Sequence, residues 1–425
     1  MPNDHFWLPP ALENPRVRLY AAGHAISVLG TWVQSTALSW LVFRLTGSVF
    51  MLGVMGFLLQ IPFLLLGPFS GRIVDRMPKL PLLIAIDLAL STNAMFSATM
   101  AWSGVTNVWF YLAAAVLHGS LNAFEMPTRQ SLLAQVVADR SLMPSAMGVS
   151  ATLFNSGRMI GPAVAGLALL HISEAWCFMF NALSNLAIIA ALLMMRLPPE
   201  DMTTSRRRVQ AGVWSSMGSL WRVPAVNILL PMITITGMFG VCYVHLMPKI
   251  ADEFFQGKSG TYGILMSSAG LGALCAAFFL SMQRGTESQR RLIASAPVVL
   301  GVAFSLFALS SSLPITMLLL AVIGASLMCC ANSTNVLLQQ SVSDEWRGRV
   351  IGLYAMSFQG VAPVGTLLAG LLASHIGLKL TLLVNGLIIL TAAILQRRRL
   401  ARHPDALDNV DMQPDAPARR EQPAE

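Results

Sequence analysis

The chain has 425 residues, of which 55% are hydrophobic and only 11% are charged, and its mean hydropathy is +0.63. Soluble globular proteins carry roughly 25% charged residues, so the composition excludes an ordinary soluble protein and indicates many membrane-spanning segments. The formal net charge of +8 would suit a nucleic-acid partner, unless the basic residues follow a membrane topology.

Twelve apolar segments are long enough to cross a bilayer as helices, which takes about 20 residues each. In the first half they cover residues 18–43, 49–70, 80–101, 108–123, 144–170 and 175–195. In the second half they cover residues 225–247, 262–282, 292–311, 314–338, 350–375 and 378–396. The sequence therefore predicts an all-α polytopic membrane protein with twelve transmembrane helices in two six-helix bundles.

The remaining segments are polar and divide the chain into five parts. Residues 1–17 are interrupted by prolines and precede a helix that is long enough to stay in the membrane, so we expect a cytoplasmic N-terminus and no cleaved signal peptide. The bundles are residues 18–195 and 225–396, the arginine-rich segment 196–224 is a cytoplasmic linker, and residues 397–425 form a disordered cytoplasmic tail.

The basic residues determine the expected orientation. With both termini in the cytoplasm, 23 of the 28 lysines and arginines fall on the inner side and four on the outer side, while Arg158 lies within a helix. Such a bias is the positive-inside rule, which predicts a multi-pass protein of the cytoplasmic membrane. It also accounts for the high net charge, so no nucleic-acid partner is expected.

The two halves resemble each other at an offset of 204 residues. This offset carries Gly161 onto Gly365, Gly166 onto Gly370, His171 onto His375 and Asn181 onto Asn385. The matches favour two pseudo-symmetric bundles, which is the arrangement that rocks around a central site in transporters.

Polar residues recur at helical spacing within the apolar segments, which places each set on one helix face. The candidates for a substrate cavity are Thr31, Gln34, Asn122, Asn155, Arg158, Asn332 and Asn335. Each of these side chains could instead hydrogen-bond a neighbouring helix as packing. As a set they favour a shared water-filled cavity.

Three charged residues lie at depth, where a charge costs at least about 2.5–3.5 kcal/mol. Arg158 needs a carboxylate, a cluster of carbonyls or an anionic ligand, so we expect it to contact either the substrate or a carboxylate on a neighbouring helix. Asp87 and Glu125 are candidates to carry a coupling proton. The alternative is a static ion pair.

Several short motifs stand in a recurring order. They are Leu45-Thr46-Gly47-Ser48, Gly71-x-x-x-Asp75-Arg76, Met126-Pro127-Thr128-Arg129-Gln130, a helix-5 motif with Gly157, Gly161, Pro162 and Gly166, and Arg347-Gly348-Arg349-Val350. In this order and spacing the chain resembles the major facilitator superfamily, in the exporter branch of the enterobactin exporter and macrolide-efflux-type proteins.

The resemblance implies roles for the loop residues and a direction of transport. Gly71, Asp75 and Arg76 would belong to a cytoplasmic gate, in which Asp75 caps or pairs at the inner end of helix 11 and Arg76 holds the outward-facing state. Arg129 and Arg347 would play matching roles in other inner loops. The helix-5 motif is typical of exporters, so siderophore or drug efflux is expected, with the proton gradient as energy source.

The chain departs from the family pattern in places that bear on coupling. Pro78 and Leu80 replace the usual glycine and final basic residue of the helix 2–3 loop, and Ala165 replaces a glycine of the helix-5 motif. Helix 4 lacks the arginine of many proton-coupled drug exporters between residues 111 and 119, and the first helix has no carboxylate. Proton coupling is therefore implied by the resemblance alone.

No motif indicates an enzyme, a cofactor or a metal site. The sequence has no complete nucleotide-binding Gly-x-x-x-x-Gly-Lys-Ser/Thr loop, no paired histidines at metal-ligand spacing and no nucleophile elbow. The expected partners are a small-molecule substrate and the lipid bilayer, with the chain as a monomer. The rival interpretations are an importer of the same fold, a non-transporting receptor or scaffold, and a membrane-embedded hydrolase.

Overall fold

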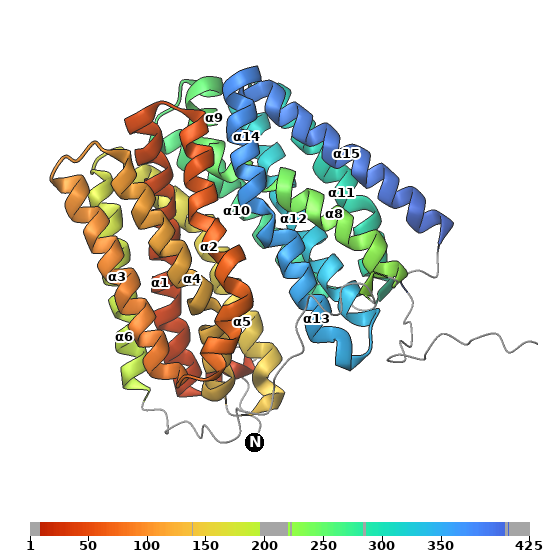
Figure 1. The fold of residues 1–425 in the computed structure, drawn as a ribbon, viewed down its shortest axis with the longest axis horizontal. Helices are drawn as coiled ribbons and strands as arrows, with labels where there is room; N and C mark the ends of the chain where they lie inside the picture. The colour runs from red at the N-terminus through yellow and green to blue at the C-terminus, as the bar shows by residue number, and fades with distance from the viewer. Residues whose placement is uncertain are drawn as a thin grey trace, which may run out of the picture.

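A computed structural model describes residues 9–137, 139–195, 220–221, 223–283, 286–403 and 407 (Figure 1). Within these ranges the secondary structure is helical. The first half contains η1 (Pro10–Glu13), α1 (Pro15–Thr46), α2 (Val49–Asp75), α3 (Lys79–Trp102), α4 (Val108–Val137), η2 (Arg140–Leu142), α5 (Met143–Ala168) and α6 (Glu174–Met194). The second half contains α8 (Pro224–Gly240), α9 (Tyr243–Phe255), α10 (Ser259–Met282), α11 (Thr286–Leu309), α12 (Leu313–Gln340), α13 (Asp344–Ala355), η5 (Met356–Gly360), α14 (Ala362–Ile376) and α15 (Leu378–Arg402).

The turn between α1 and α2 explains one of the sequence motifs. Gly47 ends α1 in the left-handed region at φ 60°, which glycine adopts without steric cost. The hydroxyl of Ser48 then accepts a hydrogen bond from the Met51 N–H at 3.3 Å and caps α2. The motif residues therefore serve as helix caps.

Equivalent helices pair in the same way in both bundles, which confirms the internal repeat. Helix α2 packs on α4 as α10 packs on α12, and α3 packs on α6 as α11 packs on α15. The matched asparagines also play equivalent roles: Asn181 donates to Gln34 of α1, and Asn385 donates to the Cys242 sulfur, which lies between α8 and α9.

The two bundles contact each other along two glycine seams at one end of the molecule. Gly53 of α2 faces Gly370 of α14, and Gly166 of α5 faces Gly263 of α10; a Cβ on any of these four would lie under 3.0 Å from backbone across the seam. We call this the seam end. At the opposite end of α2 and α5, a Cβ at Gly67, Gly71 or Gly148 would meet nothing within 4 Å. Figure 1 shows the ribbons of the bundles diverging toward that end, where α13 lies.

Ten helices in the described ranges are long and apolar enough to cross a membrane. The predicted spans outside this set are α4 and α5, which carry the intramembrane charges Glu125, Arg129 and Arg158. The count of twelve therefore stays a prediction, whereas the all-helical membrane fold is confirmed.

Several predicted boundaries are wrong. Helix α4 continues to Val137 instead of ending near residue 123, because Pro127 is accommodated inside the helix. Helix α15 continues to Arg402, past the predicted start of the tail at residue 397. Most of the predicted linker and of the tail lies outside the described residues. The seventh predicted span is interrupted between α8 and α9, and the eleventh contains the π turn η5.

Candidate functional site

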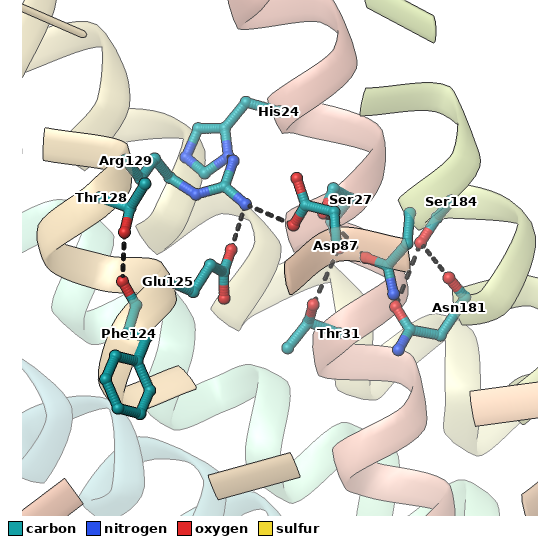
Figure 2. A network of polar contacts seen from close by, with 11 residues as sticks. His24, Ser27, Thr31, Asp87, Phe124, Glu125, Thr128, Arg129, Asn181 and Ser184 are labelled. Atoms are coloured by element: carbon teal, nitrogen blue, oxygen red, sulfur yellow. Dashed lines mark hydrogen bonds and ion pairs between the residues drawn. The ribbon is translucent and has the colours of Figure 1, made fainter. Parts of the chain in front are cut away.

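A buried cluster of charges joins three helices of the first bundle (Figure 2). Glu125 and Arg129 lie one turn apart on α4, so their side chains meet on one helix face and form an ion pair. The same terminal nitrogen of Arg129, Nη2, also contacts Asp87 Oδ1 of α3 at 3.4 Å. The other terminal nitrogen of Arg129 lies 2.9 Å from His24 Nδ1 of α1.

The cluster is largely buried and contains more acidic than basic groups. Asp87 is fully buried, its Oδ2 has no hydrogen-bond partner among the described residues, and the Arg129 side chain is only 12% exposed. Two carboxyl groups face one guanidinium, so electrical neutrality of the cluster requires one added proton. Buried charged groups are tolerated when their charges balance. Because one carboxyl group is in excess here, the cluster is chemically suited to hold a proton.

His24 is an acceptor in this arrangement. Arginine has only N–H donors, so the Nδ1 atom of His24 must carry a lone pair while it contacts Arg129. The ring also stacks on Tyr20, with centroids 5.6 Å apart. While this contact holds, His24 Nδ1 cannot take up a proton, so only the carboxyl groups of the cluster could do so.

The cluster corrects the predicted position of Arg129. The sequence interpretation placed Arg129 in an inner loop as a gating residue, but it lies inside α4 with its side chain buried against α1 and α3. The structure also joins Asp87 and Glu125, which the sequence interpretation treated as separate candidates. The four-residue spacing of Glu125 and Arg129 could have predicted their ion pair. It was overlooked because the predicted helix ended at residue 123, before both residues.

Two of the predicted cavity residues are both buried and hydrogen-bonded inside the first bundle. Gln34 is buried and accepts a 2.6 Å bond from Asn181 of α6. Asn155 is buried and donates to the Ala151 carbonyl of its own helix at 2.8 Å. Both contacts favour the packing role that the sequence left open for these residues.

The other predicted cavity residues are partly exposed. Thr31, Asn122, Asn332 and Asn335 are half-buried. The Thr31 hydroxyl donates to the Ser27 carbonyl, and Asn335 accepts a 3.0 Å bond from Gln339. Their role in a cavity therefore stays a prediction.

Arg158 has a different environment from Arg129. It is half-buried on α5, and no ion pair among the described residues includes it. Its guanidinium lies near the hydroxyl of Tyr243, at the start of α9 in the second bundle. The expected carboxylate partner on a neighbouring helix is therefore not found in the described part of the chain.

The helix-5 motif lets α5 approach two neighbours closely. A Cβ on Gly157 or Gly161 would lie 2.5 Å or 2.4 Å from side-chain atoms of α1, whereas a Cβ on Gly166 would lie 2.6 Å from Gly263 Cα of α10. Pro162 lies within α5 and contributes a carbonyl oxygen to the same seam. The motif thus serves packing within the first bundle and contact between bundles.

The predicted gating residues lie at the end opposite the seams. Asp75 and Arg76 are exposed at the C-terminal end of α2, and the Arg76 N–H caps that helix. Gly71 has open space around it rather than a pressed helix. Arg347 is exposed in the first turns of α13. Their gating roles remain predictions.

One polar contact between the bundles was not anticipated. The Gln60 side chain of α2 lies 3.0 Å from His245 Nε2 of α9, and a Cβ on Gly56 would lie 2.8 Å from the same imidazole ring. His245 is buried. The sequence offered only isolated polar residues here, since nothing in it pairs positions 60 and 245.

Comparison with known proteins identifies the family. A family model described as a transmembrane secretion effector matches residues 10–422. The staphyloferrin A transporter of Staphylococcus aureus is 26% identical over 366 residues, covering 84% of this chain and 90% of the relative. Macrolide efflux protein A of Streptococcus pyogenes is 23% identical over 398 residues, covering 90% and 96%. The multidrug efflux pump Tap of Mycolicibacterium fortuitum is 24% identical over 373 residues, covering 86% and 91%.

Solved structures share the fold. A mutant of the nucleoside transporter NupG superposes with a TM-score of 0.71 at 14% identity, covering 91% of this chain and 99% of the other. An inward-facing, unoccupied bacterial homologue of the lysosomal transporter Spinster gives 0.67 at 12% identity, covering 92% and 98%. At these identities the likeness concerns the fold alone.

Proposed function

We propose a direction, an energy source and a substrate type for this chain, which belongs to the transmembrane secretion effector family of major facilitator transporters. The chain exports a small amphipathic molecule across the cytoplasmic membrane by alternating access, in exchange for protons. Both termini face the cytoplasm. Siderophores, drugs and similar metabolites are the candidate substrates.

The observation that carries alternating access is the one-sided closure of the bundles. Backbone meets backbone at the two glycine seams, while glycines at the opposite end of the same helices have open space. Under the positive-inside orientation the seam end is the outer end, so this state is inward-facing. Export requires such a state to load substrate from the cytoplasm.

The buried charge cluster supports proton exchange. In the proposed cycle, a proton on Glu125 or Asp87 weakens the hold of that carboxyl group on Arg129 and loosens the link between α1, α3 and α4. Loss of the proton restores the ion pairs. Because the cluster has one more carboxyl group than cations, it changes by a single charge without leaving a cation unpaired.

The names of the relatives support the outward direction and the substrate type. Two of the three relatives are called efflux proteins, and the third is called a staphyloferrin A transporter. An importer of the same fold is the rival proposal, and the sign of the substrate gradient separates the two.

The test uses purified full-length protein in proteoliposomes with an imposed pH gradient. A macrolide, a cationic dye and an iron-free siderophore serve as probes, with and without an uncoupler. We expect at least one probe to move against its gradient only while the pH gradient lasts. Asp87→Asn and Glu125→Gln should lose this concentrative movement while the proteins stay folded. Full concentrative transport in both variants would refute proton coupling, and movement in the opposite sense would establish an importer.

A further inference from the structure

Arg158 is a cation without a carboxylate partner among the described residues, and it lies at the contact between the two bundles. Its carbonyl oxygen would lie 2.9 Å from a Cβ on Gly270, so α5 presses on α10 of the second bundle at this point. The guanidinium reaches toward Tyr243 of α9, in that same bundle. Although the position is interfacial, Arg158 is only half-buried, so part of it stays accessible between the bundles.

Tyr243 supplies a second unsatisfied polar group. Its side chain is fully buried, and its ring packs edge-on against Phe304 and Phe307 with centroid distances of 5.8 Å and 6.5 Å. The hydroxyl oxygen contacts the Arg158 guanidinium, which can only donate, so the O–H proton itself has no acceptor among the described residues. Buried tyrosine hydroxyls usually have a partner, so this one is positioned for a group that binds beside Arg158.

The two groups together match a carboxylate. A guanidinium presents a planar fork of N–H donors that fits both oxygens of a carboxylate, and a tyrosine hydroxyl adds a third donor. A cation at membrane depth is costly when unpaired, and an anionic ligand would supply the missing charge. Neutral or cationic ligands would leave Arg158 unpaired.

An apolar surface lies one helical turn away. Phe154 precedes Arg158 by four residues on α5, so the two side chains share a face of the helix. The Phe154 side chain is 51% exposed and meets the Trp32 ring of α1 edge-on at 5.7 Å. An amphipathic molecule could therefore place its acid group at Arg158 and an aromatic or aliphatic part along Phe154.

We propose that Arg158 and Tyr243 bind the carboxylate of an amphipathic organic acid, and that Phe154 and Trp32 contact its apolar part. This inference rests on the proposed transport function and assigns its substrate class. Because Arg158 and Tyr243 belong to different bundles, the bound acid also bridges the parts that separate during the transport cycle.

The experiment measures binding to purified full-length protein by dansyl fluorescence. The probes are dansyl-phenylalanine and its methyl ester, which differ only in the carboxylate. We expect the acid to bind at least about tenfold more tightly than the ester. Arg158→Gln should abolish this preference, Arg158→Lys should keep part of it because the charge remains but the fork is lost, and Tyr243→Phe should reduce it.

The matched control is Arg291→Gln, which removes a cation from an exposed pair with Glu287. It should leave the acid preference unchanged. Equal affinity of the unmodified protein for acid and ester, absence of acid binding, or a preference that survives in Arg158→Gln would overturn the proposal. A preference unaffected by Tyr243→Phe would remove Tyr243 from the site. Since binding is measured without transport, failure of the proteoliposome assay would refute the export function and leave this result standing.

Discussion

The glycine seams allow the conformational equilibrium to be shifted by a single methyl group. A Cβ on Gly166 would lie 2.6 Å from Gly263 Cα and 2.8 Å from the Ser259 carbonyl oxygen, whereas ordinary contact begins at 3.4 Å. Both obstacles are backbone atoms, which cannot move aside as a flexible side chain can. Gly166→Ala therefore requires the bundles to separate by about 1 Å at the seam end, a typical overpacking strain of about 1–3 kcal/mol.

This strain affects the state that is closed at the seam end and not the state that is open there. The contact exists where the seam end is closed, so the strain raises the free energy of that state and leaves a state open at the seam end unaffected. A difference of 1–3 kcal/mol corresponds to a shift of about 5- to 150-fold in the equilibrium. Gly370→Ala should act in the same direction, because Gly370 faces Gly53 across the equivalent seam.

Distances between spin labels at the seam end measure this shift. Asn107 and Lys258 are exposed in loops of the first and second bundle and can carry the labels once the exposed Cys275 has been replaced by serine. We expect the long-distance population to grow in Gly166→Ala. The control is Gly148→Ala on the same helix, where the added methyl meets nothing within 4 Å. An unchanged distribution in folded Gly166→Ala, or equal widening in Gly148→Ala, would refute the reasoning.

Three further changes test the other structural assignments. Arg129→Gln leaves the buried Asp87 and the partly buried Glu125 without their cation, so we expect the free energy of unfolding to fall by about 3–5 kcal/mol. The Arg129→Gln/Asp87→Asn double variant should recover part of this loss, and an unfolding temperature unchanged from the unmodified protein would contradict the cluster. Asn181→Leu removes the hydrogen bond to Gln34 and should lower the free energy of unfolding by about 0.6–1.7 kcal/mol. The preference of the protein for the acid over the ester should stay the same, and a changed preference would indicate that Gln34 contacts the substrate. Gly47→Ala forces a side chain into the left-handed region and should destabilise by about 1–2 kcal/mol, whereas Gly67→Ala, in an open helical position, should not.

The fold could be predicted from the sequence because the two strongest indicators, apolar segment length and the distribution of basic residues, each depend on many residues. Apolar length and basic-residue bias each average over a whole span, so the all-helical membrane architecture does not depend on any single position. The repeat at an offset of 204 also had a structural basis, since Asn181 and Asn385 make equivalent bonds and Gly166 and Gly370 occupy equivalent seams.

The candidate site was harder to predict because it depends on which helix faces meet. Gln34 and Thr31 have the same helical periodicity, yet one bonds to α6 and the other stays half-exposed. Hydropathy ended α4 at its first charges, so Arg129 was placed in a loop although its charge is neutralised inside the bundle. Tyr243 was missed altogether, because a tyrosine in an apolar segment gives no sign that it will contact an arginine of the other bundle.

The charged residues at depth and the interrupted helices lie in different bundles. The charges at depth, Asp87, Glu125, Arg129 and Arg158, all lie in the first bundle, where α1 and α5 are unbroken. In the described part of the second bundle, the interruptions are the α8–α9 junction at residues 241–242 and the π turn η5, both in helices that contact the first bundle. Tyr243 is the first residue of α9 after that junction, and it contacts Arg158 of the first bundle. A ligand held between Arg158 and Tyr243 would therefore connect the charged bundle directly to the point where the other bundle can bend.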